Sequence, residues 1–141
     1  YGEWVTHEVW WGPDSAIFTI WPYDDPHKQL RHGIACANRE TGPGGVMEIL
    51  SQYPAWHTHG SPDQKWAMGD DFDRNLWLIN VKTKERRLLT QGHLGKGFKT
   101  HPHGSFSPDG CGIVFTSSRN NTEDVFFAEL PPWESLPPLN A

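Results

Sequence analysis

The fold of this 141-residue chain is indicated by a short stretch in its last third, HPHGSFSPDG at residues 101–110. The centre of that stretch, a small residue followed by Pro-Asp, occurs three times, at residues 12–14, 61–63 and 107–109. Successive copies begin 49 and 46 positions apart. Self-similarity at a period of roughly 40 to 50 residues is typical of repeat architectures, in which each unit stacks on a neighbour to bury its apolar faces.

Each copy lies in the same local context. A histidine-bearing segment precedes it, HEVW at 7–10, HTHG at 57–60 and HPHG at 101–104. A run rich in β-forming residues follows it, at 16–21, 65–69 and 112–117. The first two copies then carry a hairpin-like pair, 34–38 with 46–50 and 76–81 with 86–89, whereas the third carries only 124–130. Four short strands within such a period form one blade of a β-propeller.

We therefore predict an all-β fold, made of about three four-stranded antiparallel β-propeller blades, the last of which lacks its outer strand. The blades are expected over approximately 1–52, 53–92 and 93–130, followed by a proline-rich tail over 131–141. Because proline has no backbone donor, the tail is not expected to continue a sheet ladder. The alternative architecture is a β-sandwich with coincidental turns.

Three blades make an incomplete propeller, since closed rings usually have about four to eight. We expect the chain to be the C-terminal part of a longer propeller whose remaining blades cover its open faces. Otherwise we expect self-association, because uncovered sheet flanks and apolar faces are association sites.

Charge and cysteine content exclude several classes of protein. With 12 Lys+Arg against 17 Asp+Glu, the formal net charge is −5, so we expect neither nucleic acid nor anionic lipid as a partner.

The longest apolar stretches, such as residues 125–128, are far short of the ~20 residues that a membrane-spanning helix needs. Cys36 and Cys111 lack a CxxC partner and are expected to be buried small apolar residues.

The eight histidines are the clearest functional signal in the composition. In a propeller the first strand of each blade lies nearest the central channel, so equivalent positions on successive first strands converge. His57 and His103 stand four residues before their serine, whereas His7 stands five before Gly12 and therefore needs a one-residue shift such as a β-bulge. His101 and His103 flank Pro102, so both imidazoles would point the same way in an extended chain.

Neutral imidazoles from adjacent blades are suitable ligands for Zn, Mn, Fe or Ni. We predict His7, His101 and His103 as metal ligands, with His57 and His59 either at the site or in the blade packing. The alternative is that these histidines brace the inner strands by bonding neighbouring carbonyls.

Other prominent side chains are given ordinary structural roles, with one exception. Surface positions are expected for His27, His32 and His93. Turn roles are expected for Asp70 and Asp71 rather than a catalytic carboxylate pair. Strand packing is expected for Trp21, Trp66 and Trp77. The exception is the set that flanks the histidines and could stack on a sugar ring, namely Trp10, Trp11 and Trp56.

The order of the motifs resembles a known family. HEVW is followed by GPD, then WHTHGSPD with a downstream GD, then HPHGSFSPDG, IVFTSSR and a closing DVFF. This order resembles the C-terminal blades of the oligogalacturonate lyases, seven-bladed propeller polysaccharide lyases related to the TolB-type repeat. SPDG is shared by many propellers, whereas HE with a following Trp, combined with HPH before SFSPDG, is more specific. The resemblance covers nearly the whole chain in pieces.

The resemblance implies a divalent metal, typically manganese, held by His7, His101 and His103. It also implies an oligogalacturonide or related uronate oligosaccharide as the substrate, with His57, His59 and Trp10 as expected contacts, and a cytoplasmic or periplasmic location. The family has a glutamine three residues before HPH, where this chain has Phe98. A fourth ligand is therefore expected from one of a small set of donors, namely His57, His59, Gln91 or water.

The implied reaction is β-elimination, in which the metal binds the C6 carboxylate of a uronate and a base removes the adjacent C5 proton. In the family the proton-abstracting His and its assisting Arg lie on earlier blades, so no catalytic residue is expected in this chain. The alternative is a non-catalytic propeller scaffold or glycan-binding module with structural histidines. A hydrolase using Asp70 and Asp71 ranks last, because no partner residue for it is found in the sequence.

Overall fold

The computed structural model describes residues 3–22, 32–41 and 47–139. This part of the chain contains three antiparallel sheets and two short 3-10 helices, Arg39–Thr41 and Trp133–Ser135. The first sheet has the order β1 (Glu3–Trp10), β2 (Ser15–Pro22), β3 (Gly33–Asn38) and β4 (Glu48–Ser51). The second has the order β5 (His57–Gly60), β6 (Trp66–Asp70), β7 (Leu76–Asn80) and β8 (Arg86–Thr90). The third contains β9 (Ser105–Phe106), β10 (Gly112–Ser117) and β11 (Asp124–Glu129).

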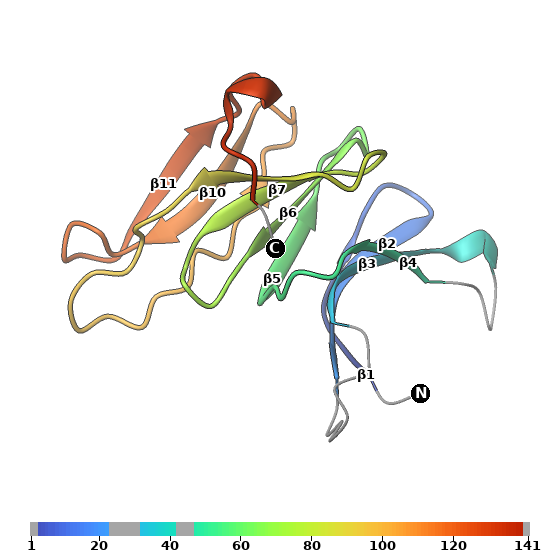
Figure 1. Ribbon diagram of the computed structural model, residues 1–141, viewed down its shortest axis with the longest axis horizontal. Coiled ribbons are helices and arrows are strands. Elements are labelled where there is room, and N and C mark those ends of the chain that lie inside the picture. Colours follow the sequence, from blue (N-terminus) through green and yellow to red (C-terminus); the bar gives the residue numbers. More distant parts are fainter. Residues whose placement is uncertain (1–2, 23–31, 42–46, 140–141) are drawn as a thin grey trace.

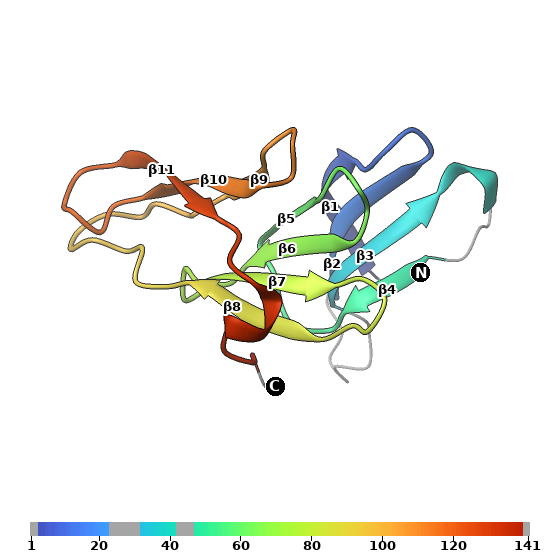
Figure 2. The ribbon, with the colours of Figure 1, turned by 90° about the horizontal axis from the view of Figure 1, so that it is seen from above.

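The three sheets follow one another in space as they do in the chain, with the second sheet between the other two (Figures 1 and 2). The all-β prediction is confirmed, and the third sheet has no fourth strand among the described residues. No helix in the described ranges is long and apolar enough to cross a membrane.

Two apolar layers hold the sheets together. Between the first and second sheets Trp11, Ile17 and Ile34 pack with Trp77 and Ile79. Between the second and third sheets the layer is built by Met68, Leu76, Leu78, Phe106, Ile113, Phe115 and Leu136. The second sheet is therefore covered on both faces, which explains why β7 reads as the apolar run LWLIN instead of alternating with polar residues.

The proline-rich tail corrects one expectation. It pairs with β8, because Leu88 N donates to Pro137 O (2.9 Å) and Leu139 N donates to Arg86 O (3.0 Å). The prolines take part only through their carbonyl oxygens, while the donors come from leucines. The tail therefore does extend a sheet, and it is the second sheet rather than the third.

Candidate functional site

Four histidines gather at one end of the stacked sheets, on segments that are far apart in the sequence. His57 lies at their centre. Its ring centroid is 4.5 Å from that of His7, 4.0 Å from that of His103 and 5.8 Å from that of His101. His57 is buried, whereas His7 and His103 are exposed and His101 is half-buried. The cluster thus has an enclosed centre and an accessible rim.

The β-bulge predicted from the histidine spacing is confirmed. The register of β1 with β2 shifts between Thr6, which is opposite Thr19, and Val9, which is opposite Ile17. Two residues of β1 therefore face one residue of β2, and His7 takes a left-handed φ of 57°. Such a conformation in a non-glycine residue is strained and re-aims the side chain, here toward His57.

Asp70 holds the cluster together, which corrects its expected role as a turn residue. It is the last residue of β6 and is fully buried. Its carboxylate accepts hydrogen bonds from the backbone N of His57 (2.7 Å) and of His103 (2.9 Å). It also lies 2.9 Å from Nδ1 of His57. Asp71 does act as a turn residue, because it accepts bonds from the backbone and side-chain nitrogens of Asn75 (2.9 and 3.0 Å).

The position of Asp70 could have been found from the sequence. The second SPD turn links Ser61 to Trp66, whose carbonyl accepts the Ser61 N–H (2.8 Å). Counting outward from this pair along an antiparallel hairpin places His57 opposite Asp70, which is the observed register. The contact of Asp70 with His103 has no such local signal, because it spans 33 positions between two sheets.

The HPH segment is not a regular strand, since β9 begins only at Ser105. His103 has a left-handed φ of 46°, so the expected common direction of the two imidazoles, which required an extended chain, does not follow. The ring of His101 packs against Trp56, with centroids 4.3 Å apart. Its Nδ1 atom is buried without a hydrogen-bond partner among the described residues. A buried imidazole nitrogen of this kind needs an acceptor, a donor or an ion.

The electrostatics favour the neutral form of two of the clustered imidazoles, His7 and His101. Desolvation lowers the pKa of His7, and the nearby His57 and His103 lower it further. Desolvation also lowers the pKa of His101, with a second contribution from the charge of Arg74. Neutral imidazoles keep a lone pair, which is the form that binds metal ions.

A divalent cation fits this cluster in donor chemistry, although the described side chains do not form a ready set of ligands. No group of three or more His, Cys, Asp or Glu side chains in the described part of the chain stands ready to hold an ion. The favourable observations are the neutral imidazoles, the unpartnered Nδ1 of His101 and the carboxylate that orients His57. The assignment of His7, His101 and His103 as ligands therefore stays a prediction.

The other predicted contact residues lie in different surroundings. Nδ1 of His59 accepts a hydrogen bond from the Phe106 N–H (3.3 Å), so this ring braces β5 against β9. Trp10 is 73% exposed and lines a shallow depression with Arg39. Trp11 is buried and donates from Nε1 to Ser61 O (2.8 Å), which corrects its predicted role in stacking on a sugar.

The structure also shows the burial of the histidines and cysteines that were predicted to have ordinary structural roles. His93 is buried rather than on the surface, because it bonds Thr90 Oγ1 (2.8 Å) and Ser117 Oγ (3.3 Å). His32 is half-buried, and His27 lies outside the described residues. Neither cysteine is fully buried, since Cys111 is exposed and Cys36 is half-buried.

An aromatic cavity of about 310 Å³ adjoins the cluster. Its lining consists of Trp4, Thr6, His7, Trp21, Trp56 and Phe72. Phe72 contacts Trp21 and Trp56, with ring centroids 5.2 and 4.9 Å apart. Phe72 and Arg74 were not predicted, because both follow β6 in a turn, and the sequence of a turn does not show which loop of a neighbouring sheet it contacts.

Two four-stranded antiparallel sheets and one three-stranded sheet, stacked side by side as repeats of one unit, define a protein of the β-propeller class. The structure is similar to that of TolB from Acinetobacter baumannii, with a TM-score of 0.65 and 16% identity over 99% of this chain and 33% of that one, which shows the fold alone.

The chain is homologous to part of the oligogalacturonide lyases. Over an alignment 153 residues long, gaps included, it is 29% identical to the oligogalacturonide lyase of Pectobacterium atrosepticum. The alignment covers 92% of this chain and 38% of that protein. The oligogalacturonate lyase of Vibrio parahaemolyticus and an oligogalacturonate lyase in complex with manganese give TM-scores of 0.72 and 0.70. Both are 26% identical, over 92% of this chain and 36% of theirs. No family model matches the sequence. The predicted resemblance is confirmed, and the chain spans less than two fifths of the curated relative.

Proposed function

We propose that this chain is part of a metal-dependent oligogalacturonate lyase that acts by β-elimination, and that it supplies the metal site but not the catalytic base. The single observation that carries the proposal is the gathering of His7, His57, His101 and His103 around Asp70, in a chain homologous to lyases of this kind. A relative solved in complex with manganese supports that metal.

In this proposal His7, His101 and His103 hold the cation. The Asp70 carboxylate accepts the Nδ1 proton of His57, so that Nε2 keeps its lone pair as a fourth donor or as a contact to substrate. A bound divalent cation would neutralise the C6 carboxylate of a uronate and make the C5 proton more acidic. The proposal assigns removal of that proton to a base outside this chain.

Substrate binding would use the aromatic cavity and a nearby cation. Trp56 and Phe72 offer flat apolar surfaces suited to the C–H faces of a sugar ring, next to His101. Arg74 lies close enough to His101 to lower the pKa of that imidazole, so its charge would also attract a uronate carboxylate. Support for His59 and Trp10 as substrate contacts is weaker, because His59 braces β9 and Trp10 lines a different depression.

The open faces of the stack support the proposal that further blades or another copy cover it. Trp4, Val5 and Trp10 are exposed on the first sheet. Val114, Val125 and Phe127 are exposed on the third. The division into blades at approximately 1–52, 53–92 and 93–130 belongs to the same proposal.

The experiment is metal analysis of the untagged chain after equilibration with manganese, together with the variant carrying His101→Ala and His103→Ala. We expect bound manganese in the wild type and its loss in the variant. Digalacturonate with the loaded chain should give no rise in absorbance near the unsaturated-uronate band. Absence of metal from both proteins would contradict the site, and a steady rise in absorbance would contradict the assignment of the base to other blades.

A second candidate function is a glycan-binding propeller module with structural histidines. It is favoured by the bracing role of His59 and by the lack of a preformed three-ligand group within the described ranges. Oligogalacturonide binding that persists without metal, and that is lost in a variant carrying Trp56→Ala and Phe72→Ala, would support this alternative.

A further inference from the structure

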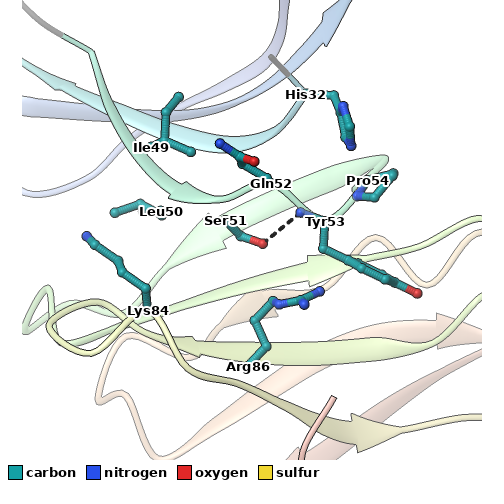
Figure 3. A pocket seen from close by; sticks show the side chains of 9 residues that line it. All are labelled: His32, Ile49, Leu50, Ser51, Gln52, Tyr53, Pro54, Lys84 and Arg86. Carbon is teal, nitrogen blue, oxygen red and sulfur yellow. Dashed lines mark hydrogen bonds between the residues drawn. The ribbon is translucent and has the colours of Figure 1, made fainter. Parts of the chain in front are cut away.

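A second cavity, of about 680 Å³, lies between the last strands of the first two sheets. Its walls are β4, the loop 52–54 that follows it, His32 and two residues at the start of β8 and its turn, Lys84 and Arg86 (Figure 3). Ser51 Oγ accepts the Tyr53 N–H (3.0 Å), which fixes the start of the loop. None of the four clustered histidines lines this cavity, so it is a separate site.

Arg86 is the unusual residue of this cavity. Its guanidinium carbon lies 4.5 Å from the centroid of the Tyr53 ring, so the side chain is held in place by stacking. Its Nη1 atom is buried and makes no hydrogen bond within the described part of the molecule. Burial also lowers the pKa of Arg86, although a guanidinium stays protonated at neutral pH.

The adjacent arginine of this strand, Arg87, differs from Arg86 because its guanidinium has hydrogen-bond acceptors. Arg87 donates from Nε to Glu85 Oε1 (2.8 Å). Its Nη1 donates to the carbonyl oxygens of Trp133 (2.9 Å) and Leu136 (3.1 Å). Arg86 has no comparable acceptor, and the described residues place no carboxylate at ion-pair distance from it.

The other charged residue of the cavity, Lys84, determines which ligand charge the cavity can bind. Lys84 is already paired with Glu48, so its charge is balanced. One uncompensated guanidinium fork is therefore left, which matches a planar carboxylate in two parallel hydrogen bonds. Ile49, Leu50 and Pro54 give the cavity apolar walls.

We propose that this cavity binds a small organic monocarboxylate, whose charged end meets Arg86 and whose apolar body packs against Tyr53, Pro54 and Ile49. The inference is independent of the lyase proposal, because it involves neither the histidine cluster nor a metal. Phosphate is disfavoured as a ligand, since the single uncompensated guanidinium balances only one of its charges and phosphate offers no apolar body.

The test is a titration of the isotope-labelled 141-residue chain with benzoate, followed by NMR of its backbone amides, in parallel with benzyl alcohol and inorganic phosphate. We expect benzoate to shift the amides of residues 50–53 and 84–87, while the neutral alcohol and phosphate leave them in place. Arg86→Gln should weaken benzoate binding at least about tenfold, the loss expected for a hydrogen-bonded charge pair. Lys82→Gln, which removes an exposed cation from the neighbouring turn, should change nothing.

Equal binding of benzoate to the wild type and Arg86→Gln would overturn the proposal, as would phosphate binding at these residues with equal strength. Should Arg86→Gln fail to fold, the wild-type shifts alone decide, because shifts confined to the histidine end of the molecule would place benzoate elsewhere.

Discussion

The second and third sheets are built from the same repeat but differ in how they are covered. In both, the same turn joins the first two strands, with Ser61 Oγ donating to Asp63 (2.7 Å) and Ser107 Oγ donating to Asp109 (2.6 Å). β7 of the second sheet is buried along four of its five residues, whereas β11 of the third has four exposed residues out of six. Identical turns therefore set the fold of a blade, and its neighbours decide which side chains become core.

The same contrast separates the histidines of the two sheets. His57 lies within β5, opposite the carboxylate of Asp70 on β6. The residue of the third repeat that corresponds to Asp70, 46 positions on, is Thr116, so this repeat has no carboxylate of its own there. His103 instead donates its backbone N–H to Asp70 across the sheet boundary. The second sheet thus organises the cluster, and the third sheet depends on it.

The largest effect is expected from truncating the core of the second sheet. Trp77→Ala should lower the free energy of unfolding by about 3–5 kcal/mol, because a fully buried ring would be replaced by a cavity. Phe127→Ala on β11 should lower it by only about 1 kcal/mol, since that ring is half exposed. Urea unfolding measures both values.

The milder replacement Trp77→Phe tests whether the ring of Trp77 stabilises the fold by packing or through its polar Nε1 atom. Nε1 of Trp77 is buried without a hydrogen-bond partner among the described residues, so Trp77→Phe should cost much less than Trp77→Ala. Similar losses in Trp77→Ala and Phe127→Ala would show that the two sheets are equally covered and would break the comparison.

The next effect concerns the dependence of the cluster on Asp70. Asp70→Asn keeps the shape of the side chain but removes the charge that orients His57, so manganese affinity should fall about 10–100-fold. Asp73→Asn, an exposed change of the same kind three residues away, should leave affinity unchanged. Isothermal titration with manganese measures both, and equal affinities in the two variants would contradict the organising role of Asp70.

The fold was predictable where its causes are local. The SPD turns close through bonds between residues two to five apart, such as Lys65 N to Asp63 (3.1 Å) and Trp66 N to Ser61 Oγ (2.9 Å). The bulge after His7 followed from a one-residue difference between repeats. Hairpin counting from the same turn also places Asp70 opposite His57, although the sequence analysis assigned Asp70 to a turn.

The candidate site was less predictable because its contacts are distant in sequence. His93 lies in a loop, where exposure is the normal expectation, yet Ser117, 24 positions away, bonds its ring. Adjacent residues of an extended chain point to opposite faces, so sequence alone did not show that Trp11 rather than Trp10 would be buried. The stacking of the sheets determines which loop contacts which neighbouring sheet, and the sequence of a single loop does not show this.

A smaller effect is expected from pH. Burial lowers the pKa of His93, His59 and His101 below 6.5, so the unfolded chain binds protons more readily than the folded one. Where only these histidines titrate, stability should therefore be highest near neutral pH and should decrease as the pH falls below the ordinary histidine value of about 6.5. Urea unfolding at pH 7.5 and 5.5 measures the decrease.

His93→Gln is the informative variant for this dependence, because His93 is the most deeply buried of the three. It should lower stability at pH 7.5 and also reduce the difference between the two pH values. An unchanged difference would place the titrating group elsewhere, and greater stability at pH 5.5 would contradict the direction of the shifts.

The smallest effect on stability, and the sharpest test of the open face, is expected on β11. Val125, Phe127 and Glu129 are exposed at alternate positions and share one face of the third sheet. The double change Val125→Thr and Phe127→Thr should alter the free energy of unfolding by about 1 kcal/mol or less, because Val125 is mostly exposed and Phe127 is half exposed. It should nevertheless reduce self-association in sedimentation measurements at increasing concentration, since an uncovered apolar face favours association. Glu129→Gln is the matched control, because it changes a residue of the same face without removing apolar area. If the wild type and both variants sediment alike, the face is not an association site, and the difference in coverage between the two sheets has no consequence for assembly.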